Sequence, residues 1–557
     1  MSILDRMATP SAPHPESPHP EAQRTEARLE AQRTEERLEP ERTEARRPEP
    51  ESTEAQPTEV STVSTAFLRQ LDDERESAMR TASHPGSAFD GADAALHDRL
   101  EELVEADRPE MLDLMLDLAE HPEVAFEEHR SARAIVDVLA AHGIEAQLGV
   151  HGLDTAIRAE ISGMSGTRPA GPGAAGAGAA GAESAGPGAD ASGVGVGADA
   201  SGVGAGVGAD AAGAGAAGAG VGDDVPTLAI LSEYDALPVV GHGCGHNVIA
   251  VMGLGAFLAL AALAKADPSA VPGRVVFLGT PAEEGHTGKE YMARNGAFDG
   301  LDAAVMAHPY GYDLADQVWL GRRTLTVEFH GHTAHASAQP FMGRNALDAA
   351  SLMYQGIGLM RQQTPPSDRI HAVIREGGDR ASVVPDYAKL DLYVRSQRPE
   401  TLKDLSSRVE DVARGAALMA GVGVSVNWDQ HPPSLPVRTN EALTGSWVQA
   451  QRRRGRDPLP FGVVSPILAA STDFGNVSYR IPGIHPVIRI APPEVALHTR
   501  EFATWAVSED ARAAASDGAY GLAATVLDAL HDPQLATAMA AEFEEAGGAI
   551  DVPSFFD

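Results

Sequence analysis

The chain has 557 residues, with 79 acidic and 43 basic side chains and a net charge of −36. This charge argues against a nucleic-acid-binding protein, because phosphate contacts need clustered Lys and Arg. A single cysteine excludes an intramolecular disulfide framework and is typical of the reducing cytoplasm, where we expect this protein. The N-terminus shows no basic stretch followed by an apolar one, so we expect no signal peptide.

Two segments of unusual composition interrupt the globular pattern. Residues 1–92 contain three copies of a charged nine-residue repeat, beginning with "EAQRTEARL" at residues 21–29. Such a segment buries too little apolar surface to offset its ordering entropy, so we expect a disordered tail. Residues 163–222 are mostly Gly and Ala, which predicts a flexible loop. Apolar strand-like segments flank this loop, so it lies within one domain, and its closure entropy is tolerable.

Residues 93–320 read as the first part of an α/β domain. Helical spacing of apolar residues precedes the Gly/Ala loop, and short apolar runs at 274–280 and 302–308 are typical of buried parallel strands. Residues 247–266 are apolar enough to raise the question of a membrane span. This segment is rich in Ala and Gly and lacks aromatic flanks, so we interpret it as a core helix and expect no membrane association.

The pattern changes at residues 321–430. Longer strands with partial alternation are interleaved with helices near 345–362 and 399–419, which predicts a small α+β domain of the ferredoxin-like kind. The α/β pattern resumes over residues 431–532 and is followed by a C-terminal tail, residues 533–557. The small domain is therefore predicted to be inserted into the large one.

Several chemically capable side chains are predicted to follow strands, where sites form in parallel α/β sheets. They are Cys244, His246, Glu283, Glu284, His308, His335 and His498. Taken singly, each has a plain alternative: a buried or nucleophilic cysteine, a solvated glutamate pair, core or loop histidines. Taken together, they supply one thiol, one carboxylate ligand, several imidazoles and a spare glutamate. That set suits two adjacent divalent ions with a bridging water, while the spare glutamate moves protons.

The ordered motifs of the chain resemble those of the M20 metallopeptidases. "EYDALP", "GHGCGHN", "GTPAEEG", "MAHP", "HTAHAS", "VVPDY" and "LHTREFA" occur in that family's order and spacing. The similarity is greatest to its aminoacylase/amidohydrolase branch, including aminobenzoyl-glutamate hydrolase subunits and β-alanyl-lysine-type dipeptidases. It covers about residues 95–530 apart from the Gly/Ala loop.

The resemblance implies a role for each motif residue. The metal ligands would be Cys244, His246, Glu284, His308 and His498, which hold two divalent ions, Zn²⁺ or Mn²⁺. Glu283 would be the general base and Asp235 would orient a ligand. The inserted domain would be a lid and dimerisation domain, and its His335 would stabilise the oxyanion, often in the site of the partner protomer. His242 and His332 have no matched role.

The resemblance also implies an activity. We expect a homodimeric hydrolase that cleaves the amide bond of a dipeptide or N-acyl amino acid, a small-molecule substrate. An aminobenzoyl-glutamate-type amidohydrolase is the alternative enzyme, and a non-catalytic binding or scaffold protein is the alternative of another class. Arg395, on a predicted strand of the small domain, is a candidate for binding a substrate carboxylate. Ser382 stands near a position where the family often has asparagine, which leaves a substrate contact there open.

Overall fold

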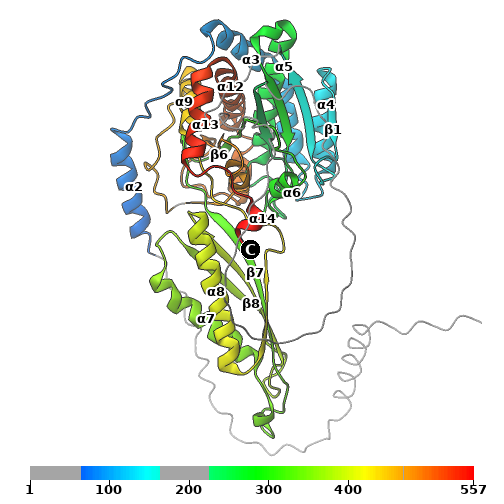
Figure 1. Ribbon diagram of the computed structural model, residues 1–557, viewed down its shortest axis with the longest axis vertical. Coiled ribbons are helices and arrows are strands. Elements are labelled where there is room, and N and C mark those ends of the chain that lie inside the picture. Colours follow the sequence, from blue (N-terminus) through cyan, green and yellow to red (C-terminus); the bar gives the residue numbers. More distant parts are fainter. Residues whose placement is uncertain (1–63, 164–224, 468) are drawn as a thin grey trace, which may run out of the picture. The chain divides into compact units, whose positions relative to one another are not determined.

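The order of the main sheet places the chemically capable loops together. The computed structural model describes residues 64–163, 225–467 and 469–557, so the charged repeat and nearly all of the Gly/Ala loop lie outside the described residues. The six strands run in the order β1 (Ala146–Leu148), β2 (Ile157–Ser162), β4 (Arg274–Gly279), β3 (Thr227–Ser232), β5 (Ala303–Val305), β11 (Gly483–Ile484). Figure 1 shows β1, the strand at one edge of this sheet, beside α4 (His129–Ala141). From β4 to β11 neighbouring strands are parallel, whereas β1 and β2 are antiparallel additions at one edge. The predicted α/β sheet is therefore a mixed one.

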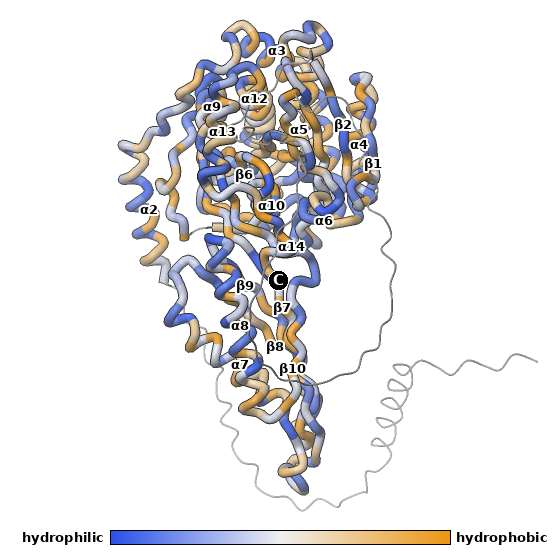
Figure 2. Tube along the Cα trace, viewed as in Figure 1, coloured by the Kyte–Doolittle hydropathy of each residue, from blue (hydrophilic) through white to orange (hydrophobic). Residues whose placement is uncertain are grey.

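Helix α5 (His246–Ala266) is the core helix of this part. It packs on β3 and β4 and against α3 (Ala94–Glu120) and α12 (Glu509–His531). Among the described residues it is the one helix long and apolar enough to cross a membrane, yet 89% of its apolar window is buried inside the protein. In Figure 2 its segment is mostly hydrophobic in colour. Burial on all sides explains why it lacks a polar face, as the sequence predicted.

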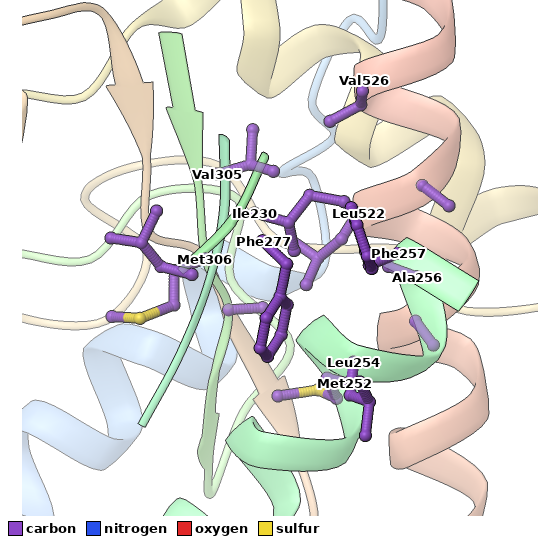
Figure 3. Packing of buried hydrophobic residues seen from close by; sticks show 14 of the residues in the cluster. Ile230, Met252, Leu254, Ala256, Phe257, Phe277, Val305, Met306, Leu522 and Val526 are labelled. Carbon is purple, nitrogen blue, oxygen red and sulfur yellow. The ribbon is translucent and has the colours of Figure 1, made fainter. Parts of the chain in front are cut away.

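The contact between α5 and the sheet depends on close packing. Figure 3 shows Ile230 and Phe277 from the strands beside Phe257 of α5 and Leu522 of α12. The rings of Phe257 and Phe277 lie 5.6 Å apart between centroids. Gly253 faces β3, and a Cβ there would lie 2.7 Å from the carbonyl oxygen of Leu231. A side chain at Gly253 would therefore push the helix from the sheet.

Two segments predicted as tails contain folded structure. Within the predicted tail 1–92, residues 66–79 form α2 (Ala66–Met79), on which Leu71 is buried. His84 is also buried, and its imidazole lies 3.1 Å from a carboxylate oxygen of Glu441. The prediction of a disordered tail was wrong for this part, because a few buried side chains such as Leu71 and His84 order the segment although most of its residues are polar or charged.

The predicted C-terminal tail, residues 533–557, is likewise folded. It holds α13 (Pro533–Glu545) and α14 (Val552–Phe555), and α13 packs against α9 (Glu441–Arg453). Leu535, Met539 and Phe543 are spaced along one helical face and are buried. The remaining helices are α4 (His129–Ala141), α6 (Gly288–Arg294), α10 (Phe474–Ser478) and α11 (Arg500–Trp505). Residues 66–557 form one compact unit.

The predicted strand 302–308 is in fact two strands. After β5 the chain leaves the main sheet, and β6 (His308–Tyr310) pairs in parallel with β12 (Val487–Arg489) in a two-stranded sheet. Both strands are largely buried and the residues that join them are apolar, so the sequence shows one continuous apolar run up to His308 and gives no sign of the break. The break sets His308 at the start of a new strand instead of the end of an old one.

Residues 321–428 form a separate four-stranded antiparallel sheet with its own apolar core. Its elements in chain order are β7 (Gly321–His330), α7 (Ala346–Met360), β8 (Arg369–Glu376), β9 (Tyr387–Ser396), α8 (Pro399–Ala420) and β10 (Gly423–Trp428). The strand order is β10-β7-β9-β8, which leaves β10 and β8 at the edges. This arrangement matches the βαββαβ pattern expected of a ferredoxin-like domain; its service as a lid or dimerisation surface stays a prediction.

The two faces of this second sheet differ in burial. Alternate residues of β7 and β9, such as Leu325, Val327 and Leu390, are fully buried and pack with α7 and α8. The residues between them are only partly buried or exposed. Because side chains alternate between faces along a strand, most polar residues of β7 and β9, with the exceptions of Arg323 and Ser396, share the face opposite the helices.

Candidate active site

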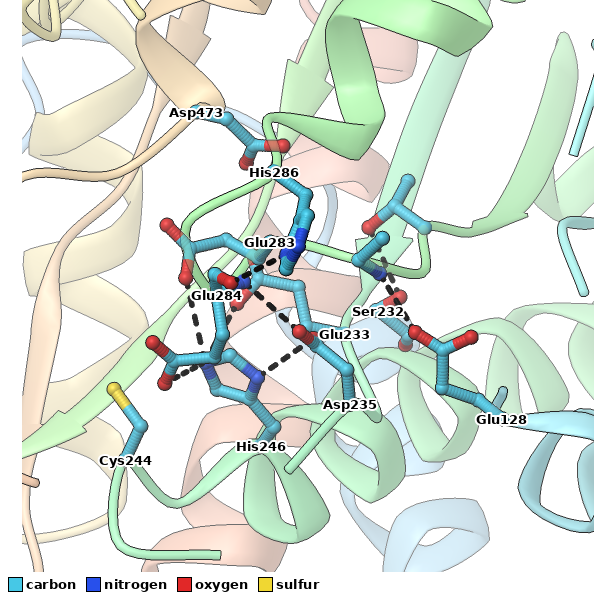
Figure 4. Close-up of polar contacts among 12 residues, drawn as sticks. Glu128, Ser232, Glu233, Asp235, Cys244, His246, Glu283, Glu284, His286 and Asp473 are labelled. Atoms are coloured by element: carbon cyan, nitrogen blue, oxygen red, sulfur yellow. Dashed lines mark hydrogen bonds and ion pairs between the residues drawn. The ribbon is translucent and has the colours of Figure 1, made fainter. Parts of the chain in front are cut away.

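Loops that follow three neighbouring parallel strands converge at one edge of the main sheet. Glu233 and Asp235 follow β3, and the glutamate pair Glu283 and Glu284 follows β4. Beyond β5 lies His308, at the start of β6. Figure 4 shows the side chains of the first two loops pointing toward His246 at the start of α5. The carboxyl edge of the sheet is the place where α/β proteins build their sites, as predicted.

The loop before α5 owes its shape to glycine. Gly245 has a φ of +85° at the N-cap of α5, and a Cβ there would lie 2.5 Å from the ring of Pro309. Only glycine fits this left-handed position without strain or a clash. The tight turn places Cys244 and His246, on either side of Gly245, toward the same region, and both are buried.

The predicted metal ligands are close to one another. The Sγ atom of Cys244 lies 3.5 Å from Nε2 of His308, and Nε2 of His498 lies 3.5 Å from Oε1 of Glu284. Three sets of potential ligand atoms each lie within 4.8 Å: Cys244 with His246 and His308, Cys244 with Glu284 and His498, and His246 with Glu283 and Glu284. The five residues predicted as ligands make up the first two sets, which share the thiol, whereas Glu283 enters only the third. His498 is half exposed, Glu284 is partly buried, and Cys244, His246 and His308 are buried.

The donor atoms fit divalent cations. Nε2 of His246, Oε1 of Glu284 and Oε2 of Glu233 are buried and form no hydrogen bond within the described part of the chain. Burying polar atoms without a partner is costly unless a ligand satisfies them. Thiolate, imidazole and carboxylate are the donors that zinc and late first-row metals accept in proteins. The arrangement therefore forms a candidate metal centre.

Asp235 supports this centre from behind. One of its carboxylate oxygens lies 2.9 Å from Nδ1 of His246, and the other accepts the backbone N–H of Glu284 at 2.9 Å. Although burial acts to raise the pKa of Asp235, His246 and the Glu284 N–H outweigh it, and the pKa is lowered. The ionised carboxylate then fixes the His246 ring so that Nε2 faces the centre. These contacts support the orienting role predicted for Asp235, which stays a prediction.

A buried lysine completes the surroundings, and the sequence did not reveal it. Lys289 on α6 is fully buried and makes ion pairs with Glu233 and with Asp473, the latter at 2.6 Å. Oε2 of Glu233 lies 3.4 Å from Nε2 of His246, so the lysine touches a carboxylate that borders the metal centre. In the sequence, Glu233, Lys289 and Asp473 resemble ordinary charged loop residues. They are far apart along the chain, and only the folded structure shows that they meet.

The protonation of the site is set by burial and crowding of carboxylates. Burial, together with Glu284 and Glu233, raises the pKa of Glu283 well above its usual range. Burial lowers the pKa of His308 to about 4, with the charge of His246 adding to the effect, which leaves a neutral imidazole suited to metal ligation. Burial and Glu284 raise the pKa of the Cys244 thiol, so a cation is needed to stabilise its thiolate.

The backbone near the site is strained. Ala282, Thr287 and His498 have φ values of +60°, +61° and +64°, in the left-handed region that non-glycine residues rarely adopt. The first two flank the glutamate pair in the chain, and His498 is itself a predicted ligand. Such strain persists where the surrounding structure holds a functional geometry.

A cavity of about 360 Å³ opens beside the candidate metal centre. Its wall includes Cys244, Glu283, Glu284, His308 and His498 on one side. The other side comes from the second sheet and includes Arg395, which was predicted to bind a carboxylate, together with Arg322, Arg369 and His371, which were not. Both parts of the chain therefore form one small-molecule site, of the size usual for such ligands.

Three histidines lie apart from this cavity. His335 and His332 are exposed in the second sheet's connecting loop, and neither lines the cavity. His242 is buried, and both of its ring nitrogens lack a hydrogen bond within the described residues. His242 and His332, which had no matched role, do not line the cavity, and the role predicted for His335 is not met within one chain.

Comparisons with known proteins agree with this site. The profile of the family described as "Peptidase family M20/M25/M40" matches residues 229–514, which include all of the predicted ligands. The chain is 37% identical to the Xaa-Arg dipeptidase of Mus musculus over 317 residues, which cover 57% of this chain and 73% of the relative. It is 30% identical to a subunit of the p-aminobenzoyl-glutamate hydrolase of Escherichia coli (strain K12) over 334 residues, or 47% and 69% of the two chains.

A solved structure shares the fold. The aminobenzoyl-glutamate utilization protein from Klebsiella pneumoniae aligns with a TM-score of 0.50 and 19% identity, covering 75% of this chain and 98% of that one. The fold, the clustered ligand atoms and the sequence matches lead to the same assignment. This chain belongs to peptidase family M20/M25/M40 and is a metal-dependent hydrolase that acts on amide bonds.

Proposed function

We propose that this protein cleaves the amide bond of a small N-acyl amino acid or dipeptide, using two divalent ions, Zn²⁺ or Mn²⁺. The observation that carries the proposal is the pair of ligand sets that share Cys244, with Glu283 in a third set beside His246 and Glu284. The five residues that would hold the ions are Cys244, His246, Glu284, His308 and His498. When bound, such ions lower the pKa of a water molecule and polarise the carbonyl under attack.

Glu283 would be the general base. Its side chain is largely buried, and its Oε2 lies 3.9 Å from Nε2 of His246, so it borders the ligand sets and lines the cavity. A carboxylate whose pKa is raised by burial accepts a proton readily near neutral pH. Glu283 would take the proton of the attacking water and deliver it to the leaving nitrogen.

Arg395 would bind the substrate's carboxylate. It lies on the open face of the second sheet and lines the cavity that also reaches Glu283. Every dipeptide or N-acyl amino acid carries an α-carboxylate next to the nitrogen that leaves. A guanidinium in the same cavity would hold that group by a charge-assisted pair of hydrogen bonds and so position the amide over the ions.

His335 would act in a homodimer. It is exposed on the second sheet's side of the molecule and outside the cavity of its own chain. β8 is an edge strand with exposed Val373 and Ile374, which offers a surface for pairing with a second copy. His335 of one protomer would then stabilise the oxyanion in the site of its partner. Light scattering tests the dimer. Dimers that mix a His335→Ala protomer with a Glu283→Gln protomer test the role of His335. If His335 acts in the partner's site, the mixed dimer has one site with both Glu283 and His335 and is active, whereas each variant alone is not. We place the dimer in the cytoplasm, on the basis of its single cysteine.

The direct test is metal removal and replacement. Protein stripped with a chelator should lose hydrolysis of a panel of N-acyl amino acids and dipeptides, and added Zn²⁺ or Mn²⁺ should restore it. Bound metal, measured by elemental analysis, should approach two ions per chain. Failure to bind metal, or full activity in the stripped protein, would refute the proposal.

A further inference from the structure

Three arginines stand side by side across the second sheet. Arg322 of β7 is the direct partner of Arg395 of β9, and Arg395 is in turn the direct partner of Arg369 of β8. All three line the cavity that contains Glu283. Like charges placed directly opposite in a sheet destabilise it, so a row of three is a costly arrangement.

The described residues do not neutralise this row. No carboxylate among them forms an ion pair with any of the three arginines. Arg322 donates to the hydroxyl of Thr287 at 2.9 Å, and Arg369 donates to the carbonyl oxygen of Asp368 at 2.9 Å. Arg395 lies over the ring of Tyr393, 4.7 Å from its centroid. Burial raises the pKa of Asp429 and Asp368, and the charges of Arg322 and Arg369 act to lower it, but neither carboxylate forms an ion pair with these two arginines, and no carboxylate of the described chain acts on Arg395.

Other arginines of the same chain are paired. Arg454, for example, contacts the carboxylates of Glu101 and Asp517, at 2.5 and 2.8 Å. The chain as a whole has 36 more negative than positive charges, so acidic partners are abundant. Burial and the charge of Arg322 lower the pKa of Arg395, which shows how unfavourable its surroundings are without an anion.

The positive row and the candidate metal centre line the same cavity. Trp319 and Leu320, which precede β7, and Leu497, next to His498, also line it. A small amide in this cavity that reaches Glu283 would therefore also meet the arginines. One α-carboxylate needs only one bidentate arginine, so the row offers room for a second carboxylate.

We propose that the amino acid released by this enzyme is dicarboxylic, so that the preferred substrates are N-acyl or peptide amides of glutamate or aspartate. Arg395 takes the α-carboxylate, as in the proposed function on which this inference rests, and Arg322 and Arg369 take the side-chain carboxylate. Arg322 and Arg369 are thus specificity-determining residues. A lysine or arginine in the same place would meet three like charges and would be disfavoured.

The test compares substrates that differ only in this charge. N-acetyl-L-glutamate, N-acetyl-L-glutamine and N-acetyl-L-lysine share an acyl group, and the first two are nearly isosteric. With metal-loaded enzyme, kcat/KM for the glutamate substrate should exceed that for glutamine about 10- to 100-fold, the usual worth of a charge-assisted contact. The lysine substrate should be poorest. Equal rates for glutamate and glutamine, or a preference for lysine, would overturn the proposal.

Variants locate the effect on the row. Arg322→Gln and Arg369→Gln should lower kcat/KM for the glutamate substrate at least about tenfold more than for the glutamine substrate, so that the preference for glutamate falls by that factor. Arg375→Gln is the matched control: Arg375 also lies on β8, is paired with Asp391 and does not line the cavity. It should change neither rate. Equal losses for both substrates would reject the specificity role.

Binding distinguishes failure of this inference from failure of the proposed function. If no amide of any class is hydrolysed, the proposed function fails. Calorimetric titration of metal-loaded protein with free L-glutamate and L-glutamine then still decides the inference. Tighter binding of glutamate that is lost in Arg369→Gln supports it, and equal binding of the two contradicts it.

Discussion

Replacing Lys289 with methionine tests how the buried charges beside the site are balanced. Lys289, Glu233 and Asp473 are all 1% exposed or less. Removing the cation leaves two carboxylates in the interior, and breaking a buried pair in this way costs about 3–5 kcal/mol. Because both carboxylates lose the same cation, we expect the free energy of unfolding at pH 7 to decrease by an amount near the upper end of that range.

The pH dependence of this loss identifies its cause. Burial raises the pKa of Asp473 even though Lys289 opposes it, so without the lysine this carboxyl would bind a proton in the folded state. The unfolded chain stays ionised between pH 7 and 5, and uptake of one proton on folding would reduce the penalty by about 1.4 kcal/mol per pH unit. The penalty should therefore be smaller at pH 5 than at pH 7.

The assay is denaturant unfolding of chelator-treated protein at both pH values, because bound metal would add its own stabilisation. Lys265→Met, an exposed change at the end of α5, is the control and should have little effect. Adding Asp473→Asn to Lys289→Met should recover part of the loss. A penalty below about 1 kcal/mol, or one that is the same at both pH values, would refute the reasoning.

Three further predictions concern the site and its support. Cys244→Ser should weaken metal binding at least about tenfold while the protein stays folded, as measured by titration with a metal indicator; unchanged affinity would exclude Cys244 as a ligand. Asp235→Asn should weaken metal binding about 10- to 100-fold by loosening His246, without touching the metal itself; an affinity equal to wild type would show that orientation is unimportant. Burial raises the pKa of Glu128 to about 7, above its unfolded value of 4.5, so unfolding free energy should fall as pH rises from 4.5 through 7, by on the order of 3 kcal/mol. Glu128→Gln should flatten that slope in pH-dependent unfolding, and a slope that persists would assign it to other groups.

The metal-binding side of the site could be predicted because its residue types and their positions after predicted strands are visible in the sequence. The single cysteine lies two residues before His246, and the glutamate pair and His308 come at the ends of apolar runs that read as strands. Gly245 marks the turn that presents Cys244 and His246 together. Sequence order is sufficient here, since parallel strands bring their carboxyl ends to one edge.

The substrate side could be predicted only in part. Arg395 was singled out as one strand arginine, but its alignment with Arg322 and Arg369 depends on the register between three strands. Register is fixed by packing and turns and cannot be read from one sequence. Lys289 escaped notice for a related reason: a lysine is normally exposed, and only the fold shows that it is enclosed by two carboxylates.

Glu283→Gln tests the central claim, metal-assisted hydrolysis with Glu283 as the base. The substitution keeps the size of the side chain and leaves all five predicted ligands in place. Elemental analysis and hydrolysis of N-acetyl-L-glutamate should be measured on the same metal-loaded samples of variant and wild type. The account predicts unchanged metal content and a kcat about 100- to 10,000-fold lower. A variant that binds the metal and hydrolyses the substrate at the wild-type rate would contradict it.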